Sequence, residues 1–89
     1  MPGLPDIVMY STGWCPYCER ARALLARKNL AFREIRLDEE PAEREGMLAR
    51  SGGRRTVPQI FIGDQHVGGF DELYALDKAG GLDALTGGD

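Results

Sequence analysis

The sequence predicts a small α/β fold, and three observations support this prediction. Short apolar runs typical of strands alternate with longer amphipathic runs typical of helices. Two strand-like runs then follow each other across Gly63-Asp64, which is a hairpin signal. A helix-like run closes the order strand, helix, strand, helix, strand, strand, helix, so we expect a sheet with one crossover and one hairpin. Because 89 residues have room for one modest core, we expect a single domain over residues 1–89.

The first half of the chain contains two expected strands and the helix between them. Residues 6–10 are short and mostly apolar, as in a strand that is buried on both faces. Pro16 suits the first turn of a helix, which we expect to run to about Lys28. Asn29 would then end the helix in a left-handed conformation. Residues 30–37 predict the second strand.

An acidic segment predicts the start of the second helix. Carboxylates in residues 38–41 suit the positive end of a helix dipole, and Pro41 suits its first turn. This helix would turn Met47 and Leu48 inward and end near residues 52–53.

The hairpin and a last helix complete the predicted sheet and its cover. Residues 57–62 and 65–67 predict the two hairpin strands. Asp71 is a candidate N-cap for the following helix. Residues 82–85 can form a last half-turn against the core, and we expect residues 86–89 to be a frayed tail.

Composition argues against several classes of protein. The formal net charge of −3 gives no general attraction to nucleic acid or to an anionic membrane. Residues 1–6 lack the basic and apolar regions of a secretory signal, and no apolar run approaches the ~20 residues that span a bilayer. Two cysteines without an export signal indicate a reducing compartment, so we expect a cytoplasmic protein.

The motif Cys15-Pro16-Tyr17-Cys18 carries the chemistry of this sequence. It places one thiol at the junction of the first strand and the first helix, beside unpaired N–H groups and the positive end of the helix dipole, which favour a thiolate. The second thiol lies one turn further along the same face. A zinc site would need two more ligands, and His66 is the only histidine, so we expect no metal. A structural disulfide is disfavoured because its loop would be so small.

Four pieces of the sequence, in this order, resemble the motifs of dithiol glutaredoxins. The resemblance implies a thioredoxin-like fold, in which three to four helices flank a four-stranded mixed sheet. It also implies a glutathione-dependent thiol–disulfide oxidoreductase that reduces glutathionylated or disulfide-bonded proteins, and we expect a monomer. The four pieces are residues 15–18, 56–62, 68–69 and 71–73.

The two cysteines of the thiol motif have different expected roles. Cys15 would be the nucleophile that attacks a mixed disulfide, and Cys18 the resolving cysteine that closes an internal disulfide with it. Pro16 stiffens the loop, and Tyr17 can flank bound glutathione or cover the disulfide.

The resemblance also implies a glutathione site. Pro58 would follow a cis peptide bond that presents the Val57 backbone to the substrate. Arg55 is the first candidate for the glycyl carboxylate, and Arg54 is a weaker one. Backbone N–H groups after Gly69 suit the γ-glutamyl carboxylate, and nearby acids suit its ammonium. The expected glutathione contacts are Tyr17, Arg55, Thr56, Val57, Pro58, Gly69, Phe70, Asp71 and Glu72.

Alternatives stay open at several of these positions. The arginines can be solvated surface charges, Asp71 a plain helix cap, and Trp14 a packing residue rather than a substrate contact. Many glutaredoxins carry lysine where this chain has Thr12, which motivates recharging by a flavoprotein reductase instead of glutathione. A [2Fe–2S] cluster shared by Cys15 of two chains and two glutathione thiols ranks below both readings.

Overall fold

Four strands form one mixed sheet in the computed structural model, which describes residues 6–86. The strands are β1 (Ile7–Ser11), β2 (Arg33–Arg36), β3 (Gln59–Ile62) and β4 (Gln65–Gly68), in the order β2-β1-β3-β4. β1 runs parallel to β2 and antiparallel to β3, and β3 and β4 form the hairpin. The helices are α1 (Pro16–Arg27), α2 (Glu43–Arg50), α3 (Phe70–Lys78) and α4 (Gly81–Thr86). This is the predicted α/β fold.

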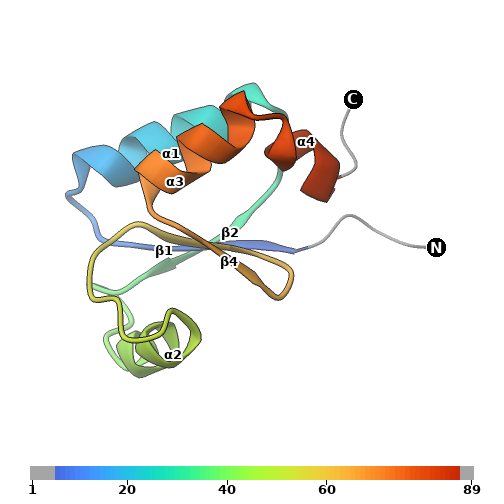
Figure 1. Ribbon diagram of the computed structural model, residues 1–89. Helices are drawn as coiled ribbons and strands as arrows, with labels where there is room; N and C mark the ends of the chain where they lie inside the picture. The colour runs from blue at the N-terminus through green and yellow to red at the C-terminus, as the bar shows by residue number, and fades with distance from the viewer. Residues whose placement is uncertain (1–5, 87–89) are drawn as a thin grey trace.

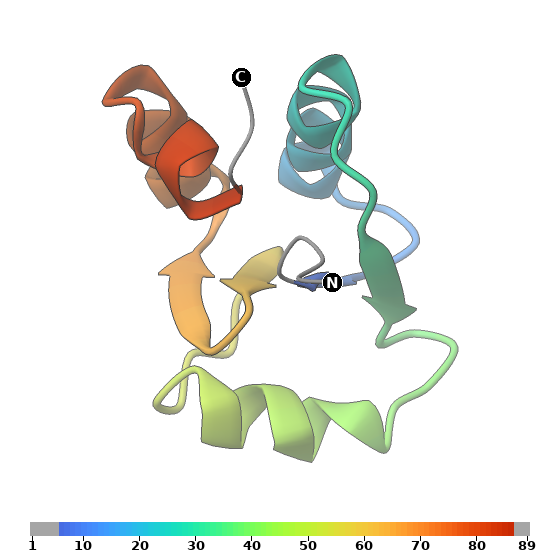
Figure 2. The ribbon, with the colours of Figure 1, turned by 90° about the vertical axis from the view of Figure 1, so that its right-hand side faces the viewer.

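The sheet lies between two layers of helix. Figure 1 shows α1 and α3 side by side on one face and α2 on the other, and Figure 2 shows the same layers from the side. Alternation along β1 divides the core accordingly. Ile7 and Met9 pack with α1 and α3, whereas Val8 and Tyr10 pack in a second cluster with Met47 of α2.

Two predicted helix starts were wrong, and local hydrogen bonds explain both. Residues 37–39 and 41–42 form turns, because the N–H groups of Glu39 and Glu43 each donate to the carbonyl three residues back and Asp38 is paired with Arg36, so α2 begins only at Glu43. Helix α3 begins one residue before Asp71. Its N-cap is Gly69, whose N–H donates to the Glu72 carboxylate over 2.8 Å, so Glu72 has the capping role expected of Asp71.

The start of β2 and the end of α4 also differ from the prediction. Asn29 has the predicted left-handed conformation, with φ of 59°, and the Leu30 N–H donates to the Leu25 carbonyl. That bond keeps Leu30 at the helix end, and β2 is shorter than predicted. Thr86, expected in a frayed tail, is buried at the end of α4 and its hydroxyl donates to the Leu82 carbonyl.

The predictions for the start of the chain, residues 1–5, and for its end, residues 87–89, lie outside the described residues. Between these ends, the structure contains no helix with the length and apolar character needed to cross a membrane.

Candidate active site

The two cysteines lie at the N-terminus of α1, directly after the loop that leaves β1. Cys15 is the N-cap, and its sulfur accepts a hydrogen bond from the Cys18 backbone N–H at 3.2 Å. The Cys15 thiol also lies 3.7 Å from the Val57 carbonyl oxygen, to which it donates. Pro16 occupies the first helical turn, where its missing N–H leaves no hydrogen bond unmade. The predicted junction of strand and helix is confirmed, and both thiols are free.

The two thiols have different surroundings. Cys15 is half-buried, whereas Cys18 is fully enclosed. Burial and the hydrogen bond with Cys15 raise the pKa of the Cys18 thiol from 9.0 to about 12, against smaller lowering effects of the Thr12 backbone and the Arg22 charge. Cys18 is therefore neutral at physiological pH in the reduced protein, and Cys15 is the accessible thiol.

The Val57–Pro58 peptide bond is cis, as the resemblance implied. A buried side chain fixes the loop before it: the Gln59 amide donates to the Thr56 carbonyl at 3.0 Å and to its hydroxyl at 3.2 Å. The Gln59 oxygen in turn lies 2.7 Å from Nε2 of His66 on β4. His66 is therefore a support of this loop and does not touch the thiols.

A hollow of about 250 Å³ lies between the cis-proline loop and the start of α3. Almost all of the residues expected to contact glutathione line it, although they come from distant parts of the sequence. The two segments lie close together at Gly69, since a Cβ placed on it would stand 3.4 Å from the Pro58 carbonyl oxygen, an ordinary van der Waals contact. The lining residues are Tyr17, Arg54, Thr56, Val57, Pro58, Gly69, Phe70, Asp71 and Glu72.

The charges around this hollow differ from the expected set at one arginine. Arg54 lines the hollow and Arg55 is not among its lining residues. Arg54 lies 3.6 Å from the Glu72 carboxylate. The Gly69 N–H, together with Arg54, holds the pKa of Glu72 below its ordinary value. Glu72 is thus already paired on both oxygens, and Asp71, which is exposed like Glu72, is the other carboxylate on the lining.

Aromatic side chains surround the thiol site. The rings of Tyr17 and Phe70 have centroids 6.4 Å apart, and the Arg20 guanidinium lies 5.1 Å from the Tyr17 ring. Trp14 is 86% exposed, so it is not a packing residue. It borders a second hollow of about 400 Å³, which is lined by Trp14, Cys15, Pro16, Glu19 and Arg20.

Sequence reasoning missed a polar cluster that joins α1, β1 and β2. Arg22 of α1 donates to both carboxylate oxygens of Glu34 on β2, with the shortest distance 2.6 Å, and the Ser11 hydroxyl donates to the same carboxylate. The signals were present: Arg22 follows Cys18 by one helical turn, and Glu34 interrupts an apolar alternation.

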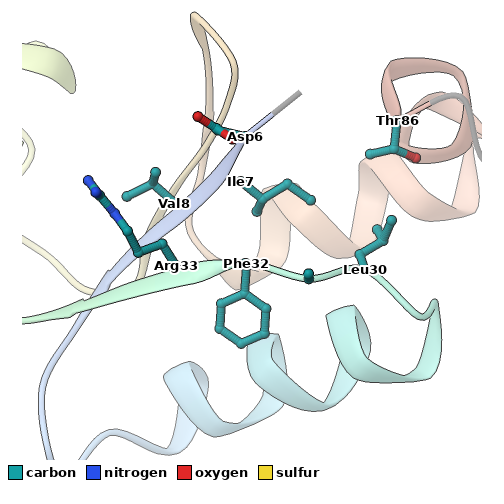
Figure 3. Close-up of a pocket in the computed structure, with 8 residues that line it drawn as sticks. Asp6, Ile7, Val8, Leu30, Phe32, Arg33 and Thr86 are labelled. Atoms are coloured by element: carbon teal, nitrogen blue, oxygen red, sulfur yellow. The ribbon is translucent and has the colours of Figure 1, made fainter. Parts of the chain in front are cut away.

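A larger hollow of about 470 Å³ lies at the other end of β1 (Figure 3). It is lined by the start of β1, the segment before β2 and Thr86 of α4, and none of the expected site residues borders it. Over residues 6–86 there is no group of three or more His, Cys, Asp or Glu side chains that could hold a metal ion.

Comparison with known proteins agrees with this geometry. The family model described as Glutaredoxin matches residues 7–67. A curated glutaredoxin of Pseudomonas aeruginosa is 56% identical over 82 residues, which are 92% of this chain and 96% of the relative.

Two solved structures extend the agreement to the fold. The glutaredoxin of Brucella melitensis superposes with a TM-score of 0.80 at 52% identity, covering 96% of this chain and 91% of the other. The buckwheat glutaredoxin–glutathione complex superposes with a TM-score of 0.83 at 32% identity, covering 92% of this chain and 76% of the other. A dithiol at a helix start, a cis-proline loop beside it and these similarities lead to one conclusion. The chain belongs to the glutaredoxin family, the thiol–disulfide oxidoreductases of thioredoxin-like fold.

Proposed function

We propose that the protein uses glutathione to reduce glutathione mixed disulfides and protein disulfides, with Cys15 as nucleophile and Cys18 as resolving cysteine. The observation that carries the proposal is that the two sulfurs differ in exposure and in hydrogen bonding. Cys15 accepts an N–H at the helix start and borders open surface, whereas Cys18 is enclosed and neutral. Hydrogen bonding to the charged form favours a thiolate, which is the attacking species in disulfide exchange.

The reaction divides into two exchanges. The Cys15 thiolate attacks the glutathione sulfur of a mixed disulfide, so the Cys15–glutathione bond forms and the substrate leaves as a thiolate. A second glutathione can then attack that bond, which releases oxidised glutathione and restores Cys15. Alternatively, Cys18 loses its proton and attacks Cys15, and reduced glutathione leaves. The resulting internal disulfide is reduced by two further glutathione molecules.

The hollow beside the cis-proline loop is the proposed glutathione site. Val57 offers its backbone to the tripeptide as a neighbouring strand would, with Tyr17 and Phe70 flanking it. Arg54, which lines the hollow, is proposed for the glycyl carboxylate. N–H groups at the start of α3 suit the γ-glutamyl carboxylate, and Asp71 suits its ammonium. A glutathione complex of a 32% identical relative supports the class of ligand.

Two cysteine variants test the mechanism. Cys18→Ser should keep glutathione-dependent reduction of a glutathionylated peptide, because a second glutathione replaces the resolving step, but it should lose the path through the internal disulfide. Cys15→Ser should lose both activities. Equal activity of Cys15→Ser on the glutathionylated peptide would show that the assignment of the nucleophile is wrong.

The reductant and the setting of the enzyme follow from the same site. We propose glutathione rather than a flavoprotein reductase as electron donor, and recycling rates with glutathione alone against thioredoxin reductase plus NADPH distinguish them. Two free thiols that work by exchange require a compartment that keeps them reduced, for which we propose the cytoplasm. We propose that a monomer is active, since one chain can supply both thiols and a hollow beside the cis-proline loop.

A further inference from the structure

We propose that Arg22, held in place by Glu34 and Ser11, is the positively charged positioning residue that supports the Cys18 thiolate during closure of the internal disulfide. This inference rests on the proposed function, because it concerns its resolving step alone. It assigns a role to a residue outside the thiol motif and outside the glutathione hollow.

The position of Arg22 on α1 directs its side chain toward Cys18. The two residues are four apart and therefore lie on one stripe of the helix. Side chains on a helix lean toward its N-terminus, so the Arg22 side chain leaves the backbone in the direction of the turn that contains Cys18. Cys18 has no exposed surface, so solvent cannot supply the stabilisation that its thiolate requires.

Glu34 and Ser11 fix the guanidinium in this place. The Arg22 Nε lies 2.9 and 3.0 Å from the two Glu34 carboxylate oxygens, and Nη2 lies 2.6 Å from one of them. The Ser11 hydroxyl, fully buried at the end of β1, donates to the same carboxylate. Residues of three elements, α1, β1 and β2, therefore hold one cation, whose side chain is 30% exposed.

The positive charge of Arg22 affects the pKa of the Cys18 thiol. Arg22 lowers the pKa of Cys18 against the larger raising effect of burial, and Cys18 in turn raises the pKa of Arg22, after the larger effect of Glu34. Arg22 is the one cation among the groups that act on Cys18 in the described chain.

The step that Arg22 supports needs no reactant other than the mixed disulfide, because every bond and proton is accounted for within it. In the Cys15–glutathione mixed disulfide, Cys18 loses its proton and its sulfur attacks the Cys15 sulfur. The Cys15–Cys18 bond forms while the bond to glutathione breaks, and the departing glutathione thiolate takes up one proton. Negative charge thus passes through Cys18, and a fixed cation beside it accelerates closure. The first attack by Cys15 does not involve this charge.

A single-turnover experiment measures closure directly. Reduced protein is mixed with excess oxidised glutathione, samples are quenched with acid, and mass spectrometry follows the mixed disulfide and the internal disulfide. We expect Arg22→Gln to slow closure about twofold, since it lowers the fraction of Cys18 present as thiolate and the greater nucleophilicity of a more basic sulfur offsets about half of that loss. Arg22→Lys keeps the charge and should close at nearly the wild-type rate. In both variants, formation of the mixed disulfide should keep its wild-type rate.

Three controls keep the outcomes distinct. Arg27→Gln removes an exposed cation from the last turn of α1 and should leave both steps unchanged. Arg22→Met removes the charge but keeps the apolar stem, so it replaces Arg22→Gln if that variant does not fold by its thermal melt. Closure at the wild-type rate in the neutral variant, or equal slowing in Arg22→Lys, would overturn the inference while the proposed function stands. A wild-type protein that never forms the internal disulfide would instead overturn the resolving role of Cys18, on which the inference depends.

Discussion

Cys15 and Cys18 share one short motif but experience different chemistry. The sulfur of Cys15 caps a helix and accepts a backbone hydrogen bond, which stabilises negative charge. The sulfur of Cys18, one turn later, is buried against the core, and burial disfavours its charge. One turn of helix is therefore enough to separate an accessible nucleophile from a thiol that reacts only with its neighbour.

The pH dependence of alkylation tests the environment of Cys18. In a Cys15→Ser variant, the rate with iodoacetamide should keep rising with pH beyond 9.0, because burial, which does not depend on Cys15, still raises the pKa of Cys18 above 9.0 and only the thiolate reacts. The rate is measured by mass spectrometry between neutral and strongly alkaline pH, with the protein checked for folding at each value. A plateau below pH 9.0 would contradict the prediction.

The neighbouring arginines provide a matched test of glutathione binding. Arg54 lines the hollow and Arg55 does not, so Arg54→Gln should raise KM for glutathione roughly tenfold, as expected for loss of a charge-assisted hydrogen bond of about 1.5 kcal/mol. Arg55→Gln should change KM much less, although it removes the same charge. Steady-state kinetics with a glutathionylated peptide measure both, and the reverse order of effects would move the carboxylate contact to Arg55.

At the scale of elements, each end of α1 is closed by a different device. Its start is capped by the nucleophilic sulfur itself. Its end is closed by Asn29 in a left-handed conformation, which lets the Leu30 N–H reach back to the Leu25 carbonyl. The helix that carries both thiols is thereby fixed in length.

Asn29 gives a stability prediction with its own control. Asn29→Ala should lower the free energy of unfolding by about 1 kcal/mol, because a Cβ in the left-handed region is strained and asparagine tolerates it better than alanine. Asn29→Gly should leave stability nearly unchanged, since glycine adopts this conformation without strain. Urea unfolding followed by circular dichroism measures both variants, and equal destabilisation by both would refute the conformational explanation.

The elements were predictable where a local pattern determines them. Pro16, Asn29 and the Gly63-Asp64 turn mark boundaries that need only neighbouring residues. Predictions failed where the structure depends on side-chain pairing. The helix start expected in residues 38–41 is a turn in which Arg36 is paired with Asp38, and sequence spacing does not determine such a pair.

At the scale of the molecule, the sheet has unequal cover on its two faces. One face carries α1, α3 and α4 over a large apolar cluster, and the other carries only α2 (Figure 2). Met47 is the only fully buried residue of α2, and it packs with the inward side chains of that face of the sheet. The end of α2 leads directly into the loop that contains Arg54 and the cis-proline, so this contact positions one wall of the hollow.

Met47→Ala should therefore affect the whole molecule. We expect it to lower the free energy of unfolding by about 2–5 kcal/mol, as for other truncations of fully buried methionine. Leu48→Ala, at a half-buried neighbour, should cost less. Denaturant unfolding measures both, and an equal loss would show that α2 is held by more than one side chain.

The candidate site could be predicted in its parts but not in its assembly. The thiol motif follows from residue types and their spacing, whereas the expected glutathione contacts follow from the resemblance to glutaredoxins. All of these expected contacts except Arg55 line one hollow. The choice of Arg54 over Arg55 depends on loop direction after Gly53, which has φ of 93°. The Arg22–Glu34 pair joins a helix to a strand, and its register emerges only when both elements pack.

Trp14, which stands almost entirely in solvent beside the nucleophile, has an optical consequence. It is the only tryptophan of the chain, so all indole emission arises one residue from Cys15. A change in the bonding of that sulfur alters the surroundings of a single fluorophore, without any label. The protein thus carries its own reporter, and its fluorescence during a titration with oxidised glutathione follows changes at the reactive sulfur in real time.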